Sequence, residues 1–223
     1  MKRLSTFLLA LVLVFSLVAC GKTNTTDKDS KKETKTETKS EADKKAEKEK
    51  RKAEKKIVTF AINEDTVILQ AEGVEPKIYK NSEKGLMPGH KYEFKADPKT
   101  LEGKDKLDIK PVNLSGKAVG FSVSPKILEE VKKLMDVKFV DTRDAAKFAE
   151  KNIEGSINLT KDQVAKWFEK GAEKPVIEGI TKDTVIAVVG EDPAANAKVA
   201  EAIYKVFKVN RTLNAGKVED YLK

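Results

Sequence analysis

The chain has 223 residues, of which 36% are charged, and a formal net charge of +8. A positive charge of this size could bind nucleic acid or an anionic membrane, but the position of the charged residues in the sequence argues against nucleic acid. Residues 21–56 hold 14 Lys and Arg against 9 Asp and Glu, and Lys2 and Arg3 add two cations. The rest of the chain is therefore close to neutral and shows no basic, aromatic-interleaved face, so no nucleic-acid partner is expected.

A single cysteine, Cys20, and a single histidine, His90, restrict the chemistry that the chain can carry. They exclude a disulfide within the chain and a Cys-based metal site. A Ser-His-Asp or His-cluster site would have to be built around His90 alone. His90 follows Pro88 and Gly89 in a predicted turn, where a histidine is more often solvent-exposed than a ligand or a base. We therefore expect no metal and no other cofactor.

Residues 1–19 have the form of an export leader. Lys2 and Arg3 precede an apolar run at 4–18, which is too short for a comfortable transmembrane span. The run ends in Leu-Val-Ala-Cys-Gly, which resembles the lipobox of bacterial lipoproteins. The resemblance implies that Cys20 is lipidated and becomes the mature N-terminus, which holds the protein on the extracytoplasmic face of the cell membrane. The alternative is an ordinary secretory signal with a coincidental cysteine.

Residues 20–56 are predicted to be the lipidated Cys20 followed by a disordered, charged tether. The segment has no large apolar residue, so it cannot bury surface to offset the entropy of ordering. Its second half, 41–56, is rich in Ala, Glu and Lys, and pairs such as Glu41 and Lys45 favour a transient helix. A solvated stalk is favoured over a spacer that contacts anionic lipid or wall polymer.

Residues 57–116 are predicted to form a small β-rich domain. Val58, Phe60 and Ile62 alternate with smaller residues, and further short runs follow between turn-forming residues, at 66–71, 76–79, 92–96 and 107–114. Such runs indicate several antiparallel strands. About 60 residues is near the lower limit for a β-sandwich or a small curled sheet. The interleaved lysines and carboxylates at 97–108 indicate a surface loop rather than a calcium loop.

Residues 117–223 alternate strand and helix patterns, which predicts an α/β domain with a parallel sheet. Ser124 and Pro125 are typical of the cap and first residue of a helix. The apolar run at 184–189 predicts a central strand that is buried on both faces. Asp192 is the predicted cap of the next helix, which would begin at Pro193 and turn Ala197, Ala200, Ile203, Tyr204 and Phe207 inward.

The stretch 138–159 carries a recognisable motif: a strand entering Asp141-Thr142-Arg143, a helix with Phe148, and then Ile153, Gly155, Ile157 and Asn158. It closely resembles the first signature of the rhodanese-like family. The resemblance covers 121–223 and includes a short strand at 211–213, a turn at 214–216 and a closing helix. It implies that the signature residues Asp141, Arg143, Gly155 and Asn158 are structural. Asp141 and Arg143 are expected to form a buried or half-buried ionic and N-capping arrangement rather than to act as catalytic acids.

In active sulfurtransferases of this family, the buried strand delivers a cysteine that begins a six-residue, anion-binding loop. The alignment places Gly190 at that cysteine, and the loop has no arginine; it consists of Gly190, Glu191, Asp192, Pro193, Ala194 and Ala195. Glycine has no side chain on which a persulfide could form. The resemblance therefore implies that the domain is not a sulfurtransferase and has no catalytic residue of that kind.

The expected function is that of a membrane-anchored surface lipoprotein with an inactive rhodanese-like domain. That domain, the β domain or the groove between them would bind a protein or a small ligand of unknown identity. One alternative is an enzyme with relocated chemistry in the inter-domain groove, which requires His90, Glu191 and Asp192 to converge on one pocket. The other alternative is a purely structural spacer of the cell envelope.

Overall fold

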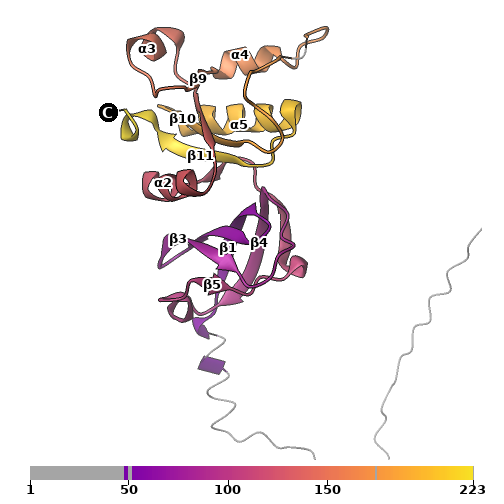
Figure 1. Ribbon diagram of the computed structural model, residues 1–223, viewed down its shortest axis with the longest axis vertical. Coiled ribbons are helices and arrows are strands. Elements are labelled where there is room, and N and C mark those ends of the chain that lie inside the picture. Colours follow the sequence, from indigo (N-terminus) through magenta and orange to yellow (C-terminus); the bar gives the residue numbers. More distant parts are fainter. Residues whose placement is uncertain (1–47, 50–51, 174, 223) are drawn as a thin grey trace, which may run out of the picture. The chain divides into compact units, whose positions relative to one another are not determined.

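The computed structural model describes residues 48–49, 52–173 and 175–222 (Figure 1). The predicted leader, Cys20 and most of the predicted tether lie outside these residues. Residues 48–49 and 52–53 are helical, and the first strand begins at Lys55 rather than at residue 57. The last two residues of the predicted tether therefore belong to the sheet. Within the described ranges, no helix has the length and apolar character that a membrane span requires.

The first sheet has six strands in the order β5-β3-β2-β1-β4-β6. All neighbouring pairs are antiparallel except β3 and β5. The strands are β1 (Lys55–Asn63), β2 (Thr66–Ala71), β3 (Val74–Asn81), β4 (His90–Ala96), β5 (Lys106–Leu107) and β6 (Leu114–Lys117). The central strand β1 is covered on both sides, because Phe60 and Ile62 enter one apolar cluster while Ile57 and Ala61 enter another.

Two predictions for this sheet are wrong in detail. The run at 107–114 is not one strand, because Pro111 starts a short 3-10 helix, η2 (Pro111–Asn113), between β5 and β6. Proline lacks the N–H that a strand needs and suits the first residue of a helix. His90 is not in a turn but is the half-buried first residue of β4.

The second sheet has five parallel strands in the order β7-β11-β10-β8-β9. They are β7 (Phe121–Ser122), β8 (Val137–Asp141), β9 (Ile157–Asn158), β10 (Val185–Gly190) and β11 (Thr212–Lys217). Every residue of the central strand β10 is buried, which confirms the prediction from its continuous apolar run. The predicted turn at 214–216 is wrong, because these residues continue β11. A short 3-10 helix, η3 (Val218–Asp220), follows in place of a longer closing helix.

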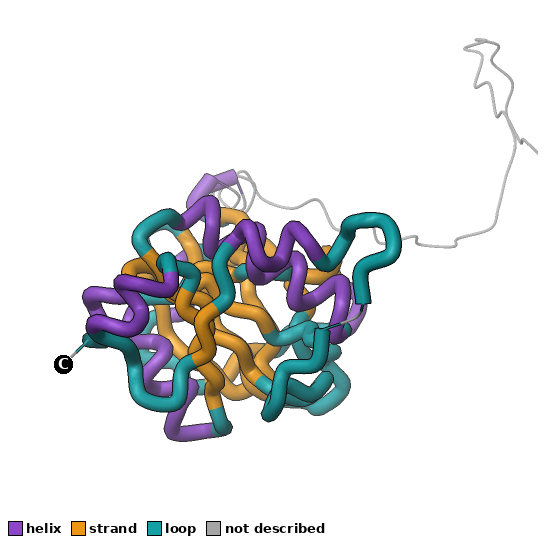
Figure 2. Tube along the Cα trace, turned by 90° about the horizontal axis from the view of Figure 1, so that it is seen from above, coloured by secondary structure: helices purple, strands orange, loops and turns teal. Residues whose placement is uncertain are grey.

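Helices lie on either side of the second sheet (Figure 2). They are α2 (Pro125–Leu134), α3 (Ala145–Glu150), α4 (Lys161–Lys166) and α5 (Pro193–Phe207). Alternate residues of β10 face α2 on one side and α4 and α5 on the other. The predicted caps are confirmed: Ser124 accepts a hydrogen bond from the Ile127 N–H, and Asp192 accepts one from the Ala194 N–H.

The predicted inward face of α5 needs correction. Ala197 is exposed, and Tyr204 and Phe207 are only half-buried. The buried residues are instead Ala195, Asn196, Val199, Ala200, Ala202 and Ile203. The predicted face contained apolar residues only, so it omitted Asn196, a polar residue that is fully buried.

The two sheets belong to one compact unit and share an apolar core. Phe60 of β1 stacks on Phe121 of β7, with the ring centroids 5.1 Å apart. Ile62 and Ile68 join the same cluster as Ile127 of α2. Gly89, which precedes β4, lies so close to the loop before β11 that an added Cβ would come within 2.3 Å of the Asn210 carbonyl oxygen. The first sheet therefore completes the core of the parallel domain.

Candidate functional site

The connection from β10 to α5 consists of only two residues, Glu191 and Asp192. The Ala194 N–H donates to the Asp192 side chain over 2.8 Å, and the Asn196 N–H donates to the Asp192 carbonyl over 3.0 Å. A cap residue uses the free amides of the first helical turn in this way. The second half of the predicted loop, from Pro193 on, is therefore helix, as its Asp-Pro start predicted.

The space above Gly190 is filled. An added Cβ would meet the Thr142 Oγ1 at 2.0 Å and the Asn196 Oδ1 at 2.6 Å. The Thr142 hydroxyl donates to the Asn196 Oδ1 over 2.8 Å, and both residues are buried. The Asn196 Nδ2 in turn donates to the Gly216 carbonyl over 2.9 Å. A hydrogen-bonded bridge between β8, α5 and β11 thus stands where a side chain at 190 would project.

Asp141 and Arg143 form a buried ion pair at the end of β8, with exposed fractions of 0% and 9%. The Arg143 Nη2 lies 2.7 Å from the Asp141 Oδ2 and also donates to the Lys151 carbonyl over 2.6 Å. The hydrogen bond to Asp141 raises the pKa of the Arg143 guanidinium above its ordinary value. The expected N-capping role falls to another residue, because Asp144, not Asp141, caps α3 by accepting from the Lys147 N–H.

The other two signature residues, Gly155 and Asn158, lie in the turn after α3 and in β9. The Asn158 Nδ2 donates to the carbonyls of Asp141 and Arg143, over 3.1 and 2.8 Å. Gly155 has a φ of +70°, a conformation that side-chain-bearing residues rarely adopt. Asn158 therefore ties β9 to the end of β8.

A depression of about 250 Å³ lies beside this junction, and its charges favour cations over anions. It is lined by the carboxylates of Asp144, Asp162, Glu191 and Asp192 and by only two cations, Arg143 and Lys161. Arg143 is already paired with Asp141, and Lys147, just outside, is paired with Glu191 over 2.7 Å. An anionic donor would meet a surplus of like charge there.

The structure does not bring His90 to this depression. The His90 Nδ1 lies 3.1 Å from the Pro88 carbonyl oxygen, and the residue pairs with Lys117 across β4 and β6. Glu191 and Asp192 line the depression without it. The described residues contain no group of three or more His, Cys, Asp and Glu that could hold a metal ion. Cys20 lies outside the described residues.

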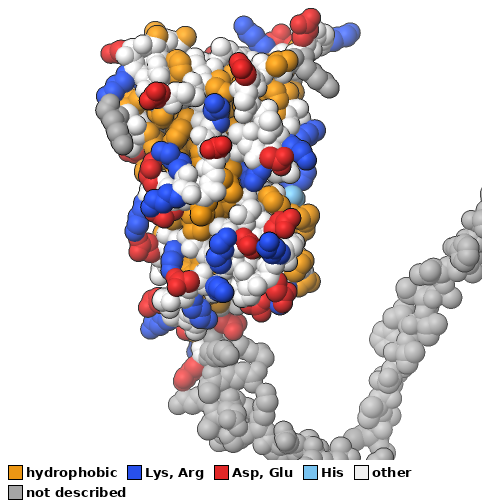
Figure 3. Space-filling model, in the orientation of Figure 1, with side chains coloured by type: hydrophobic (Ala, Val, Ile, Leu, Met, Phe, Trp, Pro, Cys, Tyr) orange, Lys and Arg blue, Asp and Glu red, His pale blue; other side chains and the backbone are white. Residues whose placement is uncertain are grey.

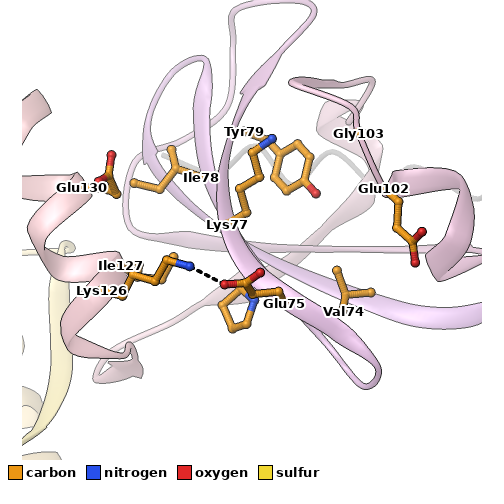
Figure 4. A pocket seen from close by; sticks show the side chains of 11 residues that line it. Val74, Glu75, Lys77, Ile78, Tyr79, Glu102, Gly103, Lys126, Ile127 and Glu130 are labelled. Carbon is orange, nitrogen blue, oxygen red and sulfur yellow. Dashed lines mark hydrogen bonds and ion pairs between the residues drawn. The ribbon is translucent and has the colours of Figure 1, made fainter.

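A larger groove lies between β3 and α2 and occupies about 500 Å³ (Figure 4). Apolar side chains dominate its lining, with Pro76 and Ile78 from β3 and Ile127 from α2. Lys126 and Glu75 form an ion pair across it. A groove between the two halves of the chain was expected, but its lining residues were not predicted, because its two walls are about 50 residues apart in the chain.

The lysines of the groove between β3 and α2 are already neutralised. Lys126 is paired as described, and Lys77 pairs with Asp105 over 2.8 Å while lying above the Tyr79 ring. On the opposite wall, Glu130 pairs with Lys133 over 2.6 Å. The groove therefore suits a largely apolar group better than a charged one.

The parallel sheet, its flanking helices and the Asp141–Arg143 junction together define an α/β domain with a strand-to-helix loop at its carboxyl edge. Residues 127–217, from α2 to the end of β11, match the family model described as the Rhodanese-like domain. The chain therefore contains a rhodanese-like domain, as the motif around Asp141 predicted. A comparison with curated proteins found no match to the chain.

Proposed function

We propose that this protein is a lipid-anchored surface protein whose rhodanese-like domain has lost sulfurtransfer and serves as a binding module. The observation that carries this proposal is the closed position at Gly190. Sulfurtransfer needs a thiolate at the end of the buried strand and a cradle of amides and cations around it. Here the Thr142–Asn196 bridge fills that position, and carboxylates replace the cations.

The first expected result is an absence of turnover in a thiosulfate:cyanide assay of the purified full-length chain. An active rhodanese-like sulfurtransferase, assayed in parallel, serves as the positive control. Gly190→Cys is expected to remain inactive as well, because its Cβ would clash with Thr142 and Asn196 and the surrounding carboxylates stay unchanged. Saturable turnover by the unmodified chain would refute the proposed inactivity.

The anchor is tested by Cys20→Ala. We expect the unmodified chain to incorporate labelled palmitate and to fractionate with membranes, because two or three acyl chains hold a protein firmly at about 0.8 kcal/mol per buried CH₂. The variant should lose both properties, while Thr25→Ala in the predicted tether should keep them. Membrane association of the Cys20→Ala variant equal to that of the unmodified chain would contradict lipidation at this residue.

The groove between β3 and α2 is the proposed place of binding, because it is the largest mainly apolar recess described above. Glu130→Trp would place an indole in the groove, whereas Glu129→Trp on the same helix changes a residue outside its lining. Proteins captured from envelope extract by the unmodified chain should be lost with Glu130→Trp and retained with Glu129→Trp. Equal capture by all three would place the binding outside this groove, and no capture by the unmodified chain would favour the structural-spacer alternative.

A further inference from the structure

A third recess, between α4 and α5, differs in its charge from the face of the molecule that Figure 3 draws. On the face drawn in Figure 3, lysines and arginines intermingle with carboxylates. The α4–α5 groove, of about 180 Å³, is instead lined by three lysines and one glutamate; they are Lys161, Lys198, Lys205 and Glu201. Glu201 is paired with Lys205 over 2.7 Å. Among the described residues, Lys161 and Lys198 have no ion-pair partner, so the lining of the groove keeps a positive surplus, although Lys161 also lines the carboxylate-rich depression beside Arg143.

The floor of the α4–α5 groove is apolar. Val164 and Ala202 are buried beneath it, and Ala165 borders it. Phe168 lies at its edge with 55% of its surface exposed, which is unusual for a residue of this size. The Lys205 Nζ lies 6.0 Å from the centre of the Phe168 ring. The groove thus combines a small apolar floor with lysines around its rim.

We infer that the α4–α5 groove docks an acidic polypeptide segment that inserts one apolar side chain between the two helices. The surplus positive charge requires carboxylates on the partner, and the recessed floor has room for a single side chain next to Phe168. A membrane surface fits less well, because insertion into lipid is favoured by protruding rather than recessed apolar groups. This inference rests on the binding role proposed above, and its failure would leave the proposed loss of sulfurtransfer unaffected.

The test measures the fluorescence anisotropy of a labelled peptide with aspartates and glutamates on both sides of one leucine. The full-length chain, in a non-ionic detergent, should bind it saturably. Lys161→Glu combined with Lys198→Glu should weaken binding by at least about tenfold, and Phe168→Ala by about fivefold. The matched controls are Lys84→Glu with Lys182→Glu, and Val176→Ala, an exposed apolar residue elsewhere. These controls should bind like the unmodified chain.

Three results would overturn the inference. One is equal binding of a peptide in which asparagine and glutamine replace the acids. Another is equal binding by the groove variants and their controls. The third is that the peptide fails to bind, while phosphatidylglycerol vesicles bind in a manner that depends on Lys161 and Lys198. That result would assign the surface to the membrane. A urea melt of each variant shows whether a loss of binding is merely a loss of folding.

Discussion

Gly190→Ala is expected to lower the free energy of unfolding by roughly 3 kcal/mol, since it combines overpacking with a broken buried hydrogen bond. The added methyl group would have to displace the Thr142 hydroxyl, 2.0 Å away, and the Asn196 amide oxygen, 2.6 Å away. These oxygens belong to short, buried side chains that are hydrogen-bonded to each other, so displacing either one breaks that bond. Urea denaturation of the full-length chain measures the change.

A double-mutant cycle separates the contact from other effects of Gly190→Ala. Thr142→Ala alone should cost about 1–2 kcal/mol, because it leaves the buried Asn196 Oδ1 without its donor. Combined with Gly190→Ala, it removes the closest clash, so the pair should be less destabilising than the sum by at least about 1 kcal/mol. Strict additivity would show that Thr142 does not occupy the position of the missing side chain. Gly190 does not have a left-handed φ, so Gly190→Ala should add no backbone strain of that kind to the clash.

Arg143→Met is expected to destabilise the protein by about 3–5 kcal/mol, because it leaves the Asp141 carboxylate buried without a partner. Lys147→Met, which breaks the exposed pair with Glu191, should cost less than about 1 kcal/mol. Both pairs have a contact of 2.7 Å, so the contrast rests on burial and on the additional hydrogen bond from Arg143 to the Lys151 carbonyl. Thermal or urea unfolding measures both values.

The combined variant Asp141→Asn, Arg143→Met gives the decisive comparison. It removes the charge that Arg143→Met leaves uncompensated, so it should recover part of the lost stability. If Arg143→Met lowers the free energy of unfolding no more than Lys147→Met does, the buried ion pair does not stabilise the fold as its burial indicates. A loss of stability without any recovery in the combined variant would point instead to the lost bond from Arg143 to the Lys151 carbonyl.

Local patterns predicted much of the fold. The run at 184–189 indicated the buried central strand, and Asp192-Pro193 indicated the start of α5, because a strand core and a helix cap are encoded by adjacent residues. The motif around Asp141 located the rhodanese-like domain correctly. The alignment also drew attention to Gly190 as the position where the family's cysteine would stand.

Contacts between distant residues could not be predicted in the same way. Thr142 and Asn196 are 54 positions apart, and neither belongs to a residue class that marks a site. Asn196 was overlooked because an inward helical face was sought among apolar residues only. The lining residues of both grooves could not be predicted for a related reason: each groove is enclosed by segments that become neighbours only when the sheets and helices pack. Burial of the face of β1 that carries Phe60 and Ile62 likewise depends on residues near the end of the chain.

The shared core has a consequence for the order in which the chain folds. Phe60, Ile62 and Ile68 are covered by residues from 118 to 218, which leave the ribosome much later. Until then, the first sheet exposes an apolar face and cannot complete its packing, since long-range contacts form only after the intervening chain is closed. Late folding of this kind keeps the nascent chain loosely structured until the second sheet has been synthesised.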